Sequence, residues 1–149
     1  MELSVRPLSK EDYNVIVSVI DHWWGGPSTA LAHPMFFYEL GKLARVAETP
    51  NGDLAGFLLG FVCPDTRLGY VHLVGIHPNF RRRGVGKLLY ASFEQACKDS
   101  GSSSLKAISM PANEASIRFH QALGWSMEHD DNYAGLGRAR VVFTKSISA

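Results

Sequence analysis

The sequence predicts a single α+β domain, and three observations point to this class. A chain of 149 residues can bury about two thirds of its unfolded surface around one core, and a hydrophobic fraction of 46% suits a globular fold. Stretches with strand character and stretches with helical apolar spacing follow one another in the order β-α-α-β-β-β-α-β-α-β-β. The sequence has neither an internal repeat nor a linker, so one domain should span residues 1–149.

The N-terminal part predicts one strand and two helices. The alternating residues 3–7 (LSVRP) favour a strand, and Ser9 followed by Asp12 resembles a capping box that opens a helix ending near Asp21. A Gly-Gly-Pro run then interrupts the pattern, and a second short helix is expected over about residues 34–42.

The middle of the chain predicts three strands and a long helix. Residues 43–62 should form a hairpin because Pro-Asn-Gly-Asp supplies turn residues between two apolar runs. The segment RLGYVHLVGIHP should be a strand that Pro78 ends, because proline cannot donate to a ladder. From Gly84 the apolar residues follow helical spacing to about Ser100, where Gly101 stops the helix.

The C-terminal part predicts a strand, a helix and two further strands. The segment SSLKAISM should be a strand, and NEASIRFHQALG a helix with Asn113 as N-cap and Gly124 just past its end. WSMEHD and RARVVFTKS should be the last two strands.

Charge and cysteine usage argue against several classes of partner. The net charge of +1 leaves residues 81–83 as the one basic stripe, so no nucleic-acid partner is expected. Cys63 and Cys97 form no C-x-x-C pattern, which indicates a reducing, cytoplasmic compartment rather than a disulfide framework. The six histidines lack metal-ligand spacing, so no metal is expected. No stretch approaches the ~20 apolar residues of a membrane span, so no membrane association is expected.

The stretch FRRRGVGKLLYASF, residues 80–93, carries arginines and glycines between a strand and a helix. Such a loop directs free N–H groups and the positive end of the helix dipole at one point, where an anion binds. A P-loop would need glycine at Arg81 and a hydroxyl side chain at Leu88, and a dinucleotide fingerprint would need glycine at Leu89. Both nucleotide motifs therefore fail, and a solvated basic turn or a small nucleic-acid patch is the alternative to an anion site.

With LVGIHP before it and NEASIRFHQALGW after it, the R-x-x-G-x-G pattern of residues 81–86 resembles the GNAT superfamily of acyl-coenzyme A dependent N-acetyltransferases. The resemblance extends from LSVRP to VVFTK. It implies a GNAT-like mixed, mostly antiparallel central sheet of about six to seven strands flanked by about four helices. It also implies acetyl coenzyme A (acetyl-CoA) as co-substrate and direct attack by a primary amine in a ternary complex.

The resemblance further implies where acetyl-CoA binds. The loop backbone would wrap the pyrophosphate, the arginine side chains would add phosphate contacts, and the preceding strand would pair with the pantetheine arm. An asparagine on the later helix would touch the pantetheine or an ordered water. The matching residues are Val74, Gly75, Ile76, Arg81, Arg82, Arg83, Gly84, Val85, Gly86, Lys87, Asn113 and His120.

The strand before the loop carries a glycine and a candidate catalytic base. Gly75 inside a strand indicates a bulge or the close approach of another backbone, with tight packing as the alternative. Alternation places Tyr70, His72 and Val74 on one face. In some relatives a glutamate at the place of His72 serves as base, and imidazole with a pKa of about 6.5 suits removal of a proton from the acceptor amine. A hydrogen-bonded structural histidine is the alternative reading of His72.

The second candidate catalytic residue is His120. It lies seven residues after Asn113, on nearly the same helical face, so both can reach one site. The family usually has tyrosine at this position, where it protonates the departing thiolate. A neutral histidine can do so only by becoming charged or through a water. The sequence therefore leaves open a catalytic or sulfur-binding role and a structural one.

The acceptor is expected to be a small-molecule or peptide amine, and a homodimer is left open. The segment DHWWGGPSTALAHPMFFYEL lies where the family places one wall of the acceptor pocket, and its aromatic rings could hold a cation. The candidate acceptor-binding residues are Trp23, Trp24, Phe36 and Tyr70. A different function is also open, namely a regulatory module that binds acyl-CoA but has lost its chemistry, because the usual tyrosine is missing.

Overall fold

The computed structural model describes residues 2–24 and 31–147, which form a seven-stranded sheet with the order β1-β2-β3-β4-β5-β7-β6. Every neighbouring pair is antiparallel except β4 and β5. The strands are β1 (Ser4–Pro7), β2 (Arg45–Glu48), β3 (Leu54–Val62), β4 (Gly69–Ile76), β5 (Ser104–Ser109), β6 (Ser126–Asp130) and β7 (Arg140–Ser146). The predicted α+β class with a mixed, mostly antiparallel sheet is confirmed.

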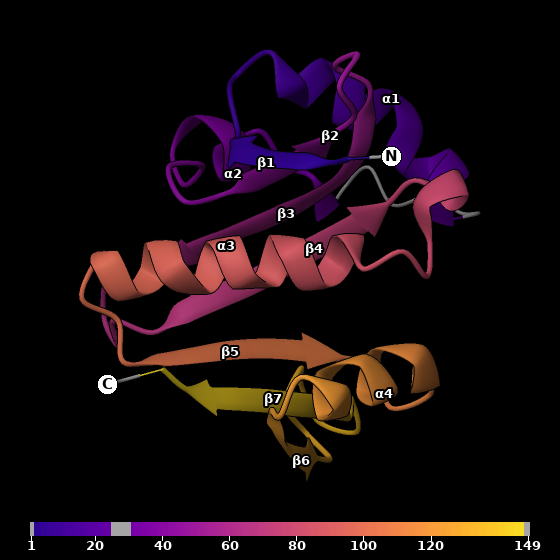
Figure 1. Ribbon diagram of the computed structural model, residues 1–149. Coiled ribbons are helices and arrows are strands. Elements are labelled where there is room, and N and C mark those ends of the chain that lie inside the picture. The colour runs from indigo at the N-terminus through magenta and orange to yellow at the C-terminus, as the bar shows by residue number, and fades with distance from the viewer. Residues whose placement is uncertain (1, 25–30, 148–149) are drawn as a thin grey trace.

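Within the described residues, four α-helices accompany the sheet (Figure 1). They are α1 (Asp12–Trp24), α2 (Met35–Tyr38), α3 (Val85–Asp99) and α4 (Glu114–Ala122), and a 3-10 turn η2 (Pro78–Phe80) precedes α3. The second helix is shorter than predicted, since it ends at Tyr38 rather than near residue 42. Beyond it, the backbone N–H of Ala44 turns back to the carbonyl of Gly41.

Two apolar cores lie on opposite faces of the sheet. On one face α3 packs Leu89 and Phe93 against Leu58 of β3. On the other face α1 packs Ile16 against Phe57, the next residue along β3. The alternation of neighbouring residues between the two cores shows that β3 is covered on both sides, as its almost continuous apolar sequence requires.

A β-bulge lies at His72. Leu59 of β3 pairs with Leu73, but its neighbour Gly60 pairs with Val71, so His72 is the extra residue of β4. As a result Val71 belongs to the core under α3, whereas Leu73 belongs to the core under α1.

The bulge corrects the prediction that Tyr70, His72 and Val74 share one face. Val74 packs against the core under α3, whereas the ring of His72 stacks on Phe36 of α2, on the opposite face. Simple alternation fails because the extra residue shifts the pattern by one position.

Gly75 is not the bulge. It pairs in regular register with Phe57, and a Cβ at Gly75 would lie well inside contact distance of the Phe57 ring. Phe57 is fully buried and cannot move aside. Tight packing, the alternative considered from the sequence, therefore explains the glycine.

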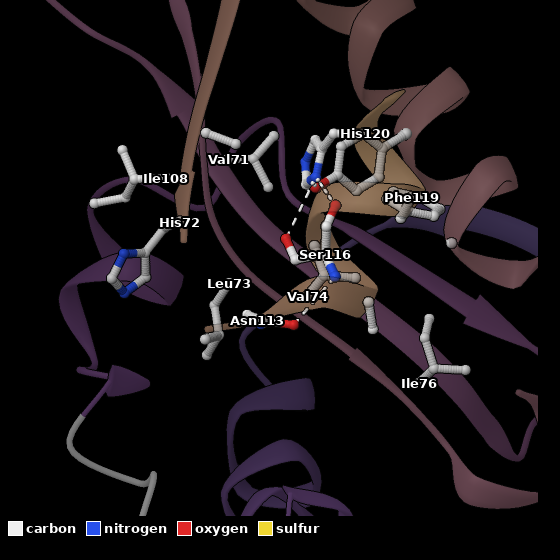
Figure 2. A pocket seen from close by; sticks show the side chains of 14 residues that line it. Val71, His72, Leu73, Val74, Ile76, Ile108, Asn113, Ser116, Phe119 and His120 are labelled. Atoms are coloured by element: carbon white, nitrogen blue, oxygen red, sulfur yellow. Dashed lines mark hydrogen bonds between the residues drawn. The ribbon is translucent and has the colours of Figure 1, made fainter. Parts of the chain in front are cut away.

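The sheet is split between β4 and β5. The two strands pair only where Gly69–Val71 faces Leu105–Ala107. Beyond Val71 they diverge, while β5 stays paired with β7 as far as Ser109 (Figure 1). The side chains around this gap, drawn in Figure 2, come from both strands and from α3 and α4.

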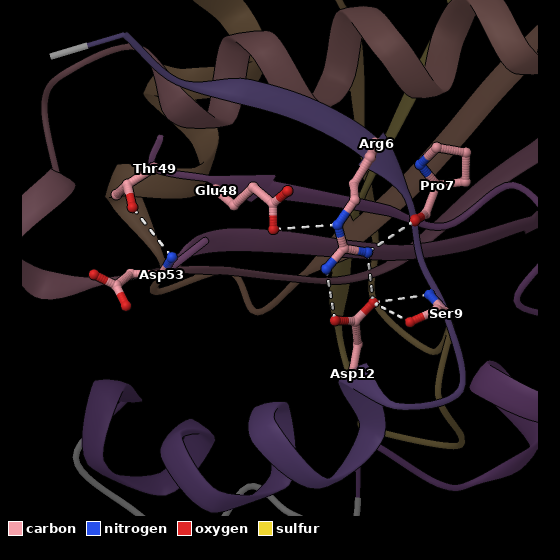
Figure 3. Close-up of polar contacts among 7 residues, drawn as sticks. All are labelled: Arg6, Pro7, Ser9, Asp12, Glu48, Thr49 and Asp53. Atoms are coloured by element: carbon pink, nitrogen blue, oxygen red, sulfur yellow. Dashed lines mark hydrogen bonds and ion pairs between the residues drawn. The ribbon is translucent and has the colours of Figure 1, made fainter. Parts of the chain in front are cut away.

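A salt-bridge network joins β1, β2 and the start of α1 (Figure 3). The Arg6 guanidinium donates from Nη1 and Nη2 to the two carboxylate oxygens of Asp12, each at 2.9 Å, and its Nε lies 3.2 Å from Oε2 of Glu48. The backbone N–H of Ser9 donates to Asp12 Oδ2 at 2.8 Å, which is one half of the predicted capping box. In place of the reciprocal bond, the Ser9 hydroxyl donates to the same oxygen at 3.2 Å, and the N–H of Asp12 donates to the Ser9 carbonyl. Burial works to raise the pKa of Asp12, but the hydrogen bonds from Arg6 and Ser9 outweigh it and hold the pKa below its usual value.

The network predicts the effect of Asp12→Asn. The free energy of unfolding should fall by about 1–3 kcal/mol near pH 7, because a neutral amide cannot accept both guanidinium hydrogen bonds. Since the pKa of Asp12 is lower in the folded protein, its contribution is present above about pH 4 and is lost as the pH falls through the folded pKa. Urea denaturation of both proteins, near neutral pH and in acid, measures the difference.

The matched control is Glu114→Gln. Glu114 pairs with Arg118 at 3.7 Å, but the two side chains are 80% and 72% exposed, so this variant should unfold like the wild type. Equal losses in both variants, or a difference for Asp12→Asn that persists in acid, would contradict the assignment.

Candidate active site

A cavity of about 430 Å³ opens where β4 and β5 diverge. Its walls come from β4, β5, α3 and α4 (Figure 2). It therefore brings together residues that lie far apart in the sequence. The sequence-predicted site residues that line it are His72, Val74, Ile76, Gly86, Asn113 and His120.

The loop before α3 has the backbone geometry of an anion site. Gly84 adopts a left-handed conformation (φ 78°) directly before the first helical residue, Val85. The first i to i−4 hydrogen bond runs from the N–H of Leu88 to the carbonyl of Gly84 at 3.0 Å. The amides of Val85, Gly86 and Lys87 therefore belong to the first helical turn, where N–H groups have no partner within the helix.

The three arginines do not act as one cluster. The Arg81 guanidinium donates to the backbone carbonyl of Trp23 in the last turn of α1. The Arg83 guanidinium lies 5.7 Å from the ring centroid of Phe80, and Arg82 stands on a left-handed backbone (φ 63°). The side chain of Arg81 thus contacts α1, while all three residues remain exposed.

His72 is held in a defined tautomer on the α1 side of the sheet. Its Nε2 lies 2.8 Å from the carbonyl oxygen of Leu31, which can only accept, so Nε2 carries the hydrogen and Nδ1 carries the lone pair. Its ring stacks on Phe36, with 3.9 Å between centroids. Burial lowers the pKa of His72, partly offset by the Leu31 carbonyl, so the imidazole is neutral near pH 7. Nδ1 has no hydrogen-bond partner among the described residues, and His72 is one of the residues that line the cavity.

His120 lies on the other side of the gap and is only 4% exposed. Its Nδ1 lies 2.8 Å from the carbonyl oxygen of Ser116, and its Nε2 lies 2.9 Å from the hydroxyl of Tyr90. The ring stacks on Phe143 with 4.1 Å between centroids. Burial lowers the pKa of His120 as well, so its imidazole is neutral. Both of its nitrogens have hydrogen-bond partners within the protein. In Figure 2 the ring of His72 points away from the group formed by Asn113, Ser116 and His120.

Asn113 serves as the N-cap of α4, as predicted. Its Oδ1 accepts from the backbone N–H of Ser116 at 3.1 Å. The cap fixes the first turn of α4 next to the cavity.

Sequence analysis missed Tyr90. Its ring lines the cavity and its hydroxyl contacts His120. A signal was present, because Tyr90 follows Gly86 by four residues and so lies one helical turn away on the same face.

Aromatic rings extend from His72 along the α2 side of the sheet. Phe61 of β3 lies 6.1 Å from Phe36 and 5.7 Å from Tyr70, centroid to centroid. Phe61 and Tyr70 border a second hollow of about 460 Å³, where Lys106 Nζ lies 4.8 Å from the ring centroid of Tyr133. The candidate acceptor residues Phe36 and Tyr70 therefore lie on one continuous aromatic surface with His72.

Trp23 does not belong to this surface. It is 5% exposed and packs its ring on Phe57 and His77, at 6.1 and 5.3 Å between centroids. The side chain of Trp24, the other tryptophan proposed from the sequence, lies outside what the structure describes.

Two absences hold for residues 2–24 and 31–147. None of the helices there has both the length and the apolar character needed to cross a membrane. In the same residues, no group of three or more histidine, cysteine, aspartate or glutamate side chains could hold a metal ion.

Known proteins resemble this chain in sequence or in fold. The chain is 27% identical over 122 residues to an aminoglycoside N(6')-acetyltransferase type 1 from Salmonella typhimurium, covering 71% of this chain and 84% of the relative. The ribosomal-protein-S18-alanine N-acetyltransferase from Escherichia coli superposes with a TM-score of 0.80, 19% identity and coverage of 99% and 96%. YncA from Salmonella typhimurium, solved with its cofactor acetyl-CoA, superposes with a TM-score of 0.74, 16% identity and coverage of 100% and 96%.

The family assignment rests on the sequence itself. Residues 11–125 match the Acetyltransferase (GNAT) family, and these residues include β4, the loop before α3, and α4. The match confirms the resemblance seen in the R-x-x-G-x-G pattern and its flanking segments. This chain therefore belongs to the GNAT family of acetyltransferases.

Proposed function

We propose that this acetyltransferase moves the acetyl group of acetyl-CoA directly to a primary amine within a ternary complex. The observation that carries the proposal is the gap between β4 and β5, because this gap connects two faces of the sheet that carry different chemical groups. The α3 and α4 side offers backbone amides and glycine, and the α1 and α2 side offers a neutral imidazole and aromatic rings. The two substrates can therefore meet in the gap without a covalent enzyme intermediate.

The α3 side of the gap suits coenzyme A. The first-turn amides of Val85, Gly86 and Lys87 would bind the pyrophosphate, and the bound thioester would supply an activated acetyl group. A Cβ at Gly86 would lie 3.2 Å from the ring of Phe119, so the glycine keeps this part of the cavity open. Beyond Val71 the edge of β4 that faced β5 is free to pair with an extended ligand at residues 74–76.

His72 is the proposed base. Its tautomer places the lone pair on Nδ1, and its neutral state at physiological pH lets it take a proton from an ammonium group. The carbonyl of Leu31 and the ring of Phe36 hold the imidazole in place. A base so positioned would act on the face opposite to the coenzyme, where the acceptor would enter.

The acceptor surface favours one amine on an apolar body over a polycation. The main cavity has no charged lining residue, and the second hollow has only Asp65 and Lys106, in the part of the chain that is described. The curated relative is named for aminoglycosides, which carry several amino groups. The rings of Phe36, Phe61 and Tyr70 would instead bury an apolar or aromatic group next to a single amine.

A second candidate function is a module that binds acyl-CoA without turnover. It is favoured by His120, whose two nitrogens are both engaged within the protein at the position of the usual tyrosine. Incubation with acetyl-CoA and a panel of amines, with free thiol as the readout, separates the two. Amine-dependent thiol release supports the transferase, and tight binding without release on any amine supports the module.

Gly86→Val tests the coenzyme site. The valine side chain would point at Phe119 and fill the cavity, so the Kd for coenzyme A should rise by about tenfold or more. Isothermal calorimetry with coenzyme A measures the change. Ala91→Val is the matched control, because it places the same β-branched residue at an exposed position of α3 and should leave the Kd unchanged. Equal affinities in all three proteins would contradict the site.

His72→Gln tests the base. Glutamine can still donate to the Leu31 carbonyl but takes up no proton, so kcat/KM should fall by about 10- to 100-fold. Because the imidazole must be neutral to act, the wild-type rate should fall as the pH drops below the lowered pKa of His72.

The pH dependence distinguishes the base from a merely structural histidine. A weakly basic aromatic amine stays neutral across the range, so its own titration does not enter. Its nitrogen becomes positively charged only on attack, and removal of that proton by His72 should make the rate fall at low pH in the wild type and not in His72→Gln. His129→Gln, an exposed histidine on β6, is the control and should behave like the wild type. Identical pH profiles for His72→Gln and the wild type would rule out the assigned role.

A further inference from the structure

We propose that Tyr90 and His120 form a proton relay, in which the Tyr90 hydroxyl protonates the sulfur that leaves when the acetyl group is transferred. The inference rests on the proposed acetyl transfer. It gives α3 the proton-donating function that the family usually places at position 120 of α4. In this relay Tyr90 is the catalytic residue that touches the sulfur, and His120 is the positioning residue that supplies the replacement proton.

The hydrogen bonds of His120 define the resting state of the pair. A carbonyl oxygen accepts only, so the 2.8 Å contact with Ser116 requires a hydrogen on Nδ1. In the neutral imidazole Nε2 then carries a lone pair, and the Tyr90 hydroxyl, 2.9 Å away, must donate to it. The single hydrogen of this hydroxyl is therefore occupied until His120 gains a proton on Nε2.

A protonated His120 would release the Tyr90 hydroxyl. The imidazolium would donate from Nδ1 to Ser116 and from Nε2 to the phenol oxygen, so both of its hydrogens would keep partners already in place. The hydroxyl hydrogen could then turn to a third atom. The cavity that both residues line is where the proposed function places the sulfur.

The side chains packed directly around the His120 ring carry no charge. The rings packed around His120 belong to Phe119 of α4, Trp125, and Phe143 of β7, and none carries charge. Tyr90 also borders a separate hollow that has three charged lining residues. They are Lys87 and Glu94 of α3 and Lys145 of β7, of which Glu94 and Lys145 pair at 2.9 Å.

The pair also accounts for the departure from the family pattern. A tyrosine at position 120 would bring a phenol to the cavity from α4. Here α4 brings an imidazole, and α3 brings the phenol from Tyr90, 30 residues earlier, to the same cavity. The chemistry of a phenol near the sulfur is kept, although the helix that carries it has changed.

The relay balances protons and electrons. As the carbon–sulfur bond breaks, its electron pair stays on sulfur, which takes the hydrogen of the Tyr90 hydroxyl. Tyr90 takes the hydrogen from Nε2 of the His120 imidazolium, which returns the pair to the arrangement in the structure. Burial lowers the pKa of His120, so its imidazolium is a stronger acid than a thiol with a pKa of about 8.5, and the transfer runs downhill. His120 then takes up a proton from the solvent. The acceptor amine releases one proton to the solvent, so the overall number of protons is unchanged.

Tyr90→Phe is the primary test. It removes the hydroxyl and keeps the ring, so kcat should fall by about 10- to 100-fold while the KM for acetyl-CoA stays the same. Tyr38→Phe, which removes a hydroxyl from an exposed tyrosine of α2, is the control and should keep the wild-type kcat. If Tyr90→Phe keeps full kcat in an active enzyme, the relay is wrong and the proposed acetyl transfer stands.

A titration of bound coenzyme A needs no acceptor amine. The ultraviolet absorbance of the thiolate, followed against pH, gives the pKa of the bound thiol. In the wild type the Tyr90 hydroxyl can donate to the thiolate while His120 Nε2 carries a proton, which stabilises the charged sulfur, so this pKa should lie about one pH unit lower than in Tyr90→Phe. Equal values overturn the relay even where no acceptor has been found. Absence of amine-dependent turnover, with this difference intact, would count against the proposed function alone.

The double variant Tyr90→Phe/His120→Tyr separates the relay from a folding defect. It returns a phenol to α4, at the position the family uses, and removes the unpaired imidazole that Tyr90→Phe leaves behind. Its kcat should recover about tenfold relative to Tyr90→Phe. No recovery, in a variant whose thermal unfolding matches that of the wild type, would contradict a phenol requirement at this cavity.

Discussion

The brief pairing of β4 with β5 is the constraint on which the site depends. Two neighbouring strands of a sheet normally satisfy each other's backbone groups along their whole length. Here the pairing stops after Val71, while β5 is still held by β7 on its far side and β4 by β3. The strands can separate without unravelling the sheet because each keeps its other neighbour. The gap leaves one backbone edge of β4 unpaired in the middle of the domain, which is a suitable place for an extended ligand.

Because of the bulge at His72, side chains on both faces of the sheet lie at the gap. Because the bulge adds one residue to β4, His72 and Leu73 both turn toward α1 and α2, and Val74 turns toward α3. The two histidines of the site therefore lie on opposite faces. Each donates to a backbone carbonyl that fixes its tautomer, and burial keeps each neutral. What distinguishes them is the other nitrogen, which in His120 accepts from a phenol and in His72 has no hydrogen-bond partner among the described residues.

Much of the fold could be predicted from the sequence because its signals are local. The capping residues Ser9 and Asn113 and the glycine before α3 act within one helical turn, and the structure has all three where they were expected. The face of the sheet on which His72 lies could not be predicted, since a bulge depends on the pairing register between β4 and β3. The partnership of Tyr90 with His120 joins two residues that lie 30 positions apart on different helices, and helical periodicity alone does not reveal which helices face each other. Gly75 was ambiguous for the same reason, because the ring that excludes a side chain there belongs to Phe57 on the next strand.

The hydrogen bond from Arg81 to the last turn of α1 affects how changes in the basic loop must be interpreted. A cation at a helix C-terminus neutralises carbonyls that would otherwise lack donors, so this arginine stabilises the end of α1. An alteration at position 81 would disturb both the loop before α3 and the end of α1. Weaker coenzyme binding after such an alteration would therefore not identify a lost phosphate contact. Arg82 and Arg83 make no hydrogen bond to α1 among the described residues, so the effect of changing either of them on coenzyme binding can be interpreted directly.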